Sequence, residues 1–148
     1  MHARQTLLTT LQTALKAATT PPWRGVFVAS VAPGKAALPA LLIGQPTEVV
    51  ADAGLYGLRR QERTLTVTVT GLMTARPDPE GTRADLNEIA EALETTVTLA
   101  TLTSADDLGL VQTETDDMPD ESGLVSITLT WWVRYATREG RPGTFGTD

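Results

Sequence analysis

A long alternation of apolar and polar residues near the C-terminus constrains the fold more than any other feature of the sequence. It opens at Gly123 and ends near Thr137. Successive side chains of a β-strand point to opposite faces of the sheet, so this segment is predicted to be a central strand. The residues on its apolar face are Val125, Ile127, Leu129, Trp131, Val133 and Tyr135. The chain must therefore bury one face of a sheet.

A second alternation, from Thr64 to Thr70, places Leu65, Val67 and Val69 on one face and only threonines on the other. This pattern predicts a half-buried strand whose second side meets water or a partner. Three weaker strands are expected, over Trp23 to Val31, Leu38 to Ile43 and Leu110 to Thr115. The segment Gln45 to Leu58 contains Pro46, Gly54 and Gly57 and is expected to be irregular.

Two segments show the period of an amphipathic helix. The first runs from about Arg4 to Ala18 and is ended by a proline pair, and the second runs from about Arg83 to Thr96. Thr82 followed by Asp85 resembles a capping box at the start of the second helix. A helix packed on the protein's own sheet is favoured over a membrane-surface helix for the first segment, because its polar face carries little basic charge.

The order of helix, strands, helix and strands interleaves too little for a doubly wound parallel sheet. It predicts an α+β fold, with a mixed, mainly antiparallel β-sheet and two α-helices packed on one face. At 148 residues, a single domain spanning 1–148 is expected. The glycine-rich segment Arg138 to Asp148 is expected to be flexible unless a partner orders it.

Composition argues against several function classes. The sequence has no cysteine and a single histidine, His2, beside the N-terminus, so thiol, Ser-His-Asp and His- or Cys-ligated metal chemistry are not expected. The glycines at 54 and 57 lack the context of a phosphate loop. The acidic run Asp116 to Glu121 departs from the calcium-loop pattern and is interpreted as solvated. We therefore expect no enzyme activity, no metal and no cofactor.

The same composition bears on partners and location. The net charge of −6 argues against a protein that reads DNA sequence, since such proteins carry basic patches. The N-terminal segment lacks the continuous apolar region of a secretory signal, and no window is apolar enough for a membrane span. We expect a protein that stays where it is made, with no membrane partner.

Several basic and aromatic residues are candidate contacts with other subunits. Charges entering the threonine-rich strand either protect a sheet edge from unwanted pairing or pair with acidic groups of a neighbouring subunit. Trp131 and Trp132 lie on opposite faces of one strand, so one fills the core and the other meets a second layer, a partner or water. The candidate contact residues are Arg59, Arg60, Arg63, Trp132, Arg134 and Arg138.

The order of elements resembles the tail terminator family of long-tailed bacteriophages, the tail-completion proteins similar to minor tail protein U. The resemblance spans most of the chain and has no motif as specific as a catalytic signature. The segments that carry it are TLLTTLQTALKAA, RRQERTLTVTVTGL, ADLNEIAEALETTV, TDDMPDESG and SGLVSITLTWWVRYATREG.

The resemblance implies a structural virion protein without enzyme activity, assembled in the host cytoplasm and located at the head-proximal end of the tail. Such proteins form a homohexameric ring on the finished tail tube, stop its polymerisation and provide the surface for head–tail joining. The implied partners are the tail tube protein and a connector or stopper protein, while DNA passes through the lumen without specific binding. Two alternatives stay open: a head-completion or connector protein, and a small ligand-binding domain or enzyme.

Overall fold

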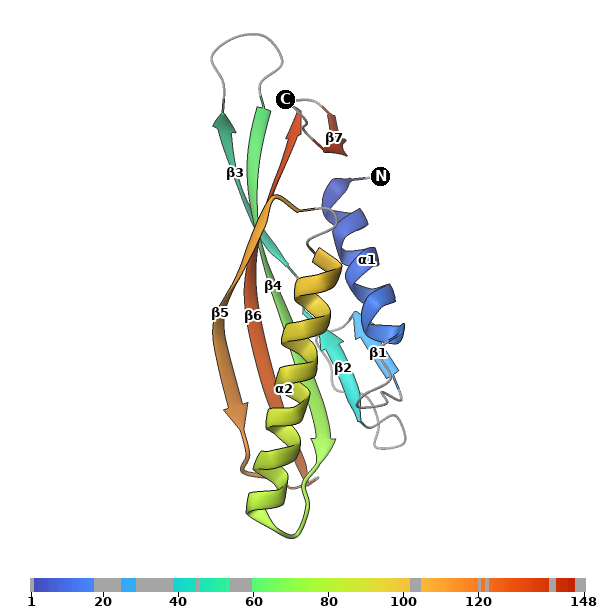
Figure 1. Ribbon diagram of the computed structural model, residues 1–148, viewed down its shortest axis with the longest axis vertical. Coiled ribbons are helices and arrows are strands. Elements are labelled where there is room, and N and C mark those ends of the chain that lie inside the picture. The colour runs from blue at the N-terminus through green and yellow to red at the C-terminus, as the bar shows by residue number, and fades with distance from the viewer. Residues whose placement is uncertain are drawn as a thin grey trace.

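A computed structural model of the chain is shown in Figure 1. It describes residues 2–17, 25–28, 39–44, 46–53, 60–101, 105–119, 121, 123–138 and 141–145. The elements are α1 (Ala3–Ala17), β1 (Gly25–Val28), β2 (Ala40–Ile43), β3 (Thr47–Ala53), β4 (Arg60–Thr74), α2 (Pro79–Thr101), β5 (Asp107–Asp116), β6 (Leu124–Arg138) and β7 (Arg141–Phe145).

Two antiparallel strands of 15 residues each, β4 and β6, form the centre of the sheet. Along the outer edge of β4, β3 pairs with residues 60–66 and β2 with residues 69–72. Along the outer edge of β6, β5 pairs with residues 126–134 and β7 with residues 137–138. Only the β1–β2 pair is parallel among the strands described. The α+β fold with a mainly antiparallel sheet is therefore confirmed.

Both helices pack on the same face of this sheet (Figure 1). The apolar residues of α1 recur at every fourth position, and those of α2 at spacings of three and four, so each helix presents one stripe to the sheet. The stripes meet the apolar face of β6 that the alternation predicts. The largest fully buried side chains are Trp131, Tyr135, Leu15, Leu41, Ile43, Leu65, Leu86, Leu93, Ile127, Leu129, Val69 and Val97.

The second helix begins earlier and ends later than its periodicity predicts. Asp78 is its N-cap residue, since its carboxylate accepts hydrogen bonds from the backbone N–H groups of Glu80 and Gly81, at 3.1 Å each. Pro79 occupies the first helical position, where a missing N–H costs nothing. The predicted capping role of Thr82 is wrong: Thr82 is buried inside the helix, and its hydroxyl donates to the carbonyl of Asp78.

Two other expectations differ from the structure. Residues 47–53, inside the segment expected to be irregular, form strand β3, because Thr47, Val49 and Val50 favour extended backbone and β4 offers a free edge. Residues 141–145, inside the tail expected to be flexible, pair with β6 as strand β7. No helix among the described residues is long and apolar enough to cross a bilayer.

Candidate functional site

The face of the sheet opposite the helices is rich in threonine. In the register of β4 and β6, Thr66 lies opposite Trp132, Thr68 opposite Thr130 and Thr70 opposite Thr128. The hydroxyl oxygens of Thr70 and Thr128 lie 3.0 Å apart. These side chains are half-buried, and no helix among the described residues covers them. We call this face, from Thr64 to Thr70 on β4 and from Ser126 to Arg134 on β6, the open face.

Trp132 lies on the open face, as the alternation predicts, whereas Trp131 is buried in the core. The indole of Trp132 lies against the backbone of Gly109 in β5, where a Cβ atom would lie 2.6 Å from the ring. The guanidinium carbon of Arg134 lies 4.7 Å from the ring centroid, close enough for a cation–π interaction. The glycine lets the ring lie flat, and the arginine holds it there. The result is a half-exposed aromatic group with a fixed orientation.

Arg60 and Arg134 line a shallow groove at one end of the open face, together with Val49, Glu62 and Asp107. The Arg60 guanidinium lies 3.4 Å from the carboxylate of Asp106. Protection of a sheet edge is one role that the sequence suggests for the charged residues at the start of β4. That role is wrong, because β4 is not an edge strand: β3 pairs with it on one side and β6 on the other. Arg59 lies outside the described residues. The backbone of Arg138 in β6 lies opposite Arg60.

Arg63 lies on the opposite side of the sheet from Arg60 and belongs to an internal network. It donates to Thr137 Oγ1 at 2.8 Å, to Glu48 Oε1 at 2.5 Å and to Gln61 Oε1 at 3.0 Å. Its side chain is 10% exposed and that of Glu48 is 6% exposed. The acidic partner of this arginine is therefore in the same chain, on β3, and the guanidinium has little surface to offer another subunit.

Glu48 also accepts a hydrogen bond of 2.5 Å from the hydroxyl of Tyr135. Burial alone would raise the pKa of the Glu48 carboxyl, but the hydrogen bonds from Tyr135 and Arg63 and the charges of Arg63 and Arg4 outweigh it, so this pKa is lowered. Burial and the adjacent carboxylate raise the pKa of Tyr135. Glu48 is therefore charged and Tyr135 is neutral at neutral pH. The Glu48–Arg63 ion pair connects β3 with β4, and the hydrogen bonds to Tyr135 and Thr137 connect both strands with β6.

His2 contacts this network. Its Nε2 lies 3.3 Å from Arg63 Nη1, and its Nδ1 lies 3.1 Å from the backbone N–H of Arg4. A neutral imidazole has one acceptor nitrogen, so only one contact is a hydrogen bond at a time. Burial, with the charges of Arg4 and Arg63, lowers the pKa of His2. It anchors the first turn of α1.

The acidic segment after β5 is only partly solvated. The Asp117 carboxylate lies 2.6 Å from Arg83 Nε of α2, and this hydrogen bond lowers the pKa of Asp117. Within the described part of the chain, no group of three His, Cys, Asp or Glu side chains is arranged to hold a metal ion. This segment therefore ties β5 to the start of α2.

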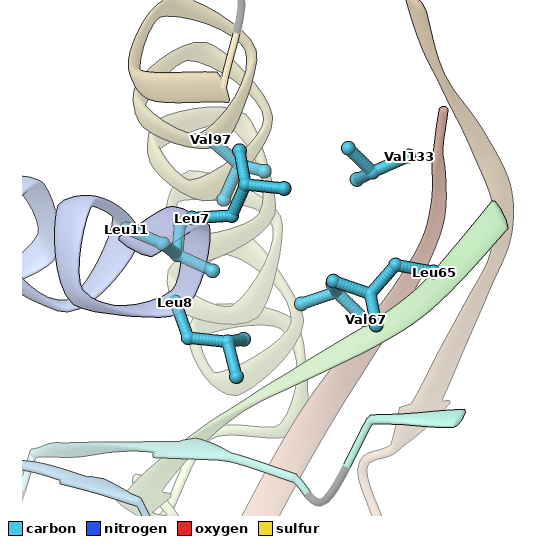
Figure 2. Close-up of a pocket in the computed structure, with 7 residues that line it drawn as sticks. All are labelled: Leu7, Leu8, Leu11, Leu65, Val67, Val97 and Val133. Carbon is cyan, nitrogen blue, oxygen red and sulfur yellow. The ribbon is translucent and has the colours of Figure 1, made fainter. Parts of the chain in front are cut away.

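The apolar layer between helices and sheet contains a small gap, shown in Figure 2. Its volume is about 10 Å³, and its seven lining residues are Leu7, Leu8, Leu11, Leu65, Val67, Val97 and Val133. A water molecule needs about this much space together with polar partners, which these side chains do not provide. The gap is a packing defect of the core and not a binding site.

No protein-family model matches the chain, and no curated protein matches it. Among solved structures, a chain in the virion of a native gene transfer agent particle is similar, with a TM-score of 0.48 and 18% sequence identity. The match covers 92% of each chain. A likeness of this size decides neither fold nor function.

Proposed function

We propose that the chain is a structural virion protein that caps a phage tail tube as a ring, stops tail polymerisation and provides the surface for head–tail joining. The observation that carries the proposal is the open face. One side of the sheet is sealed by two helices, while the other presents rows of threonine with the oriented Trp132–Arg134 pair. The element order that resembles the tail terminator family supports the same function.

A ring requires heterologous contacts, in which two different surfaces of each subunit meet. The open face and the helical face differ in chemistry, as such contacts demand. We propose Trp132, Arg134 and Arg60 as subunit contacts, because an oriented tryptophan with neighbouring arginines has the composition of interface hot spots. Arg63 is not among them, because its donors are used inside the chain.

The proposed role needs neither a catalytic group nor a cofactor. The net charge of −6 suits a ring whose lumen DNA crosses without being held through its phosphates. The partners would be the tail tube protein and a connector or stopper protein, and the location would be the head-proximal end of the tail. A head-completion protein of the neck would use similar surfaces, and binding to purified tail tubes distinguishes the two roles.

The first experiment is native mass spectrometry over a range of protein concentrations, with negative-stain images of any large species. We expect a closed six-fold ring with a central hole, formed alone or on added tail tubes. A chain that stays monomeric at every concentration and does not bind purified tail tubes would refute the proposal.

A further inference from the structure

The strand β5 is a long edge of the sheet. It pairs with β6 on one side, and no other described strand pairs with it. From Leu110 to Asp116 every residue is exposed. An unpaired edge of this length presents a row of backbone donors and acceptors on which another strand can form. Its exposed apolar residues are Leu110 (41% exposed) and Val111 (60% exposed), at the position of a β-bulge.

Acidic side chains flank this edge on the open face. The register places Glu114 opposite Thr128 and Asp116 opposite Ser126, so both carboxylates lie on that side of the sheet. Between Asp106 and Asp117 the sequence contains five acidic residues and no basic residue. The first and last of these carboxylates are paired with Arg60 and Arg83.

A further acidic side chain lies beside the edge on the helical face. The Arg83–Asp117 ion pair shows which side of α2 is turned toward β5. Glu94 follows Arg83 by 11 residues, close to three helical turns of 3.6, so it lies on that same side. A strand added to β5 would therefore have acidic groups near both of its faces.

We propose that β5 binds an extended, arginine- or lysine-bearing segment of a partner protein as an additional strand of the sheet. Backbone hydrogen bonds along β5 supply the affinity, and the acidic groups on both faces select a segment with basic side chains. The acidic part of this surface, Glu114 to Asp116, lies at the end of β5 farther from Gly109 and the proposed ring contact around Trp132.

The test uses a short peptide that alternates valine or threonine with arginine. Binding is measured by fluorescence anisotropy, and amide hydrogen exchange locates the bound peptide. We expect added protection of the amides of β5, and at least a roughly tenfold weaker affinity for the variant Glu114→Lys/Asp116→Lys. The matched control, Glu62→Lys/Glu88→Lys, has the same change in net charge at two exposed positions. Glu62 lies at the Asp107 end of the sheet, far from Glu114 and Asp116, and Glu88 lies on α2, so this control should bind as the parent does.

Two further peptides separate strand addition from simple charge attraction. Replacing arginine by glutamate should abolish binding, and methylating alternate backbone nitrogens should do the same, because it removes donors to the β5 carbonyls. Absence of binding, equal loss in both variant proteins, or retained binding of the methylated peptide would overturn the proposal. If the β5 amides of the peptide-free protein become protected from hydrogen exchange as the protein self-associates, the occupant of β5 is a second copy of this chain and the proposal is overturned. Native mass spectrometry reports ring formation separately.

Discussion

Replacing Glu48 by glutamine tests the internal network at its centre. The substitution keeps the shape of the side chain but removes the charge facing Arg63, whose own side chain is 10% exposed. Removing one partner of a buried ion pair costs about 3–5 kcal/mol. Because Arg63 keeps its bonds to Thr137 and Gln61, we expect the lower end, about 3 kcal/mol. For a chain of this length that loss lowers Tm by about 6–12 °C.

The assay is urea unfolding of the parent and Glu48→Gln proteins from pH 7 to pH 3, with the exposed Glu88→Gln as control. The pKa of Glu48 is lowered by folding, so its contribution is complete above the ordinary value of 4.5 and is lost as the pH falls through the folded value. The difference in unfolding free energy between parent and variant should therefore shrink as the pH falls below 4.5. A loss below about 1 kcal/mol at pH 7, or a difference that does not change with pH, would refute this account of the network.

Three further substitutions test the open face and the helix cap. Gly109→Ala places a methyl group 2.6 Å from the Trp132 ring, so we expect a red-shifted tryptophan emission and a loss of about 1–2 kcal/mol in unfolding free energy. The control Gly44→Ala, whose methyl group would lie 3.6 Å from Thr68, should change neither the emission nor the stability. Asp78→Ala removes the acceptor for two backbone N–H groups of α2 and should cost about 1 kcal/mol in urea unfolding, against no change for Glu88→Ala. Trp132→Ala should weaken ring formation in native mass spectra, and unchanged assembly with unchanged Tm would contradict the contact proposed for it.

The architecture could be predicted from sequence because its largest elements carry strong periodic patterns. The alternation ending near Thr137 identifies β6 and its buried face, and the helical spacing of apolar residues identifies α1 and α2. Their ends were predicted less well, since they depend on specific contacts. Asp78 rather than Thr82 caps α2, and only the structure shows which side chain reaches the free backbone N–H groups.

The internal network could not be found by the same reasoning. Glu48 lies in a segment whose glycines and prolines suggest a loop, and its partners are 15 and 87 positions away along the chain. The Thr-Glu-Val-Val start of β3 was the one available signal. The sequence predicts no catalytic or metal-binding role for His2, yet its backbone carbonyl accepts the first hydrogen bonds of α1, from Gln5 and Thr6. Pairing across a sheet depends on register, which sequence spacing alone does not reveal.

Salt concentration should separate the two proposed surfaces, because we expect them to respond to it in opposite directions. Subunits with a net charge of −6 repel one another, so screening this repulsion should favour the ring if apolar and threonine contacts hold it together. Binding of a basic strand to the acidic edge of β5 is an attraction between opposite charges, and salt should weaken it. Ring mass and peptide affinity measured between low and high ionic strength should therefore change in opposite senses. If ring formation and peptide affinity both weaken with added salt, ion pairs rather than the threonine face hold the ring together. The Arg60–Arg134 region would then pair with carboxylates of the next subunit.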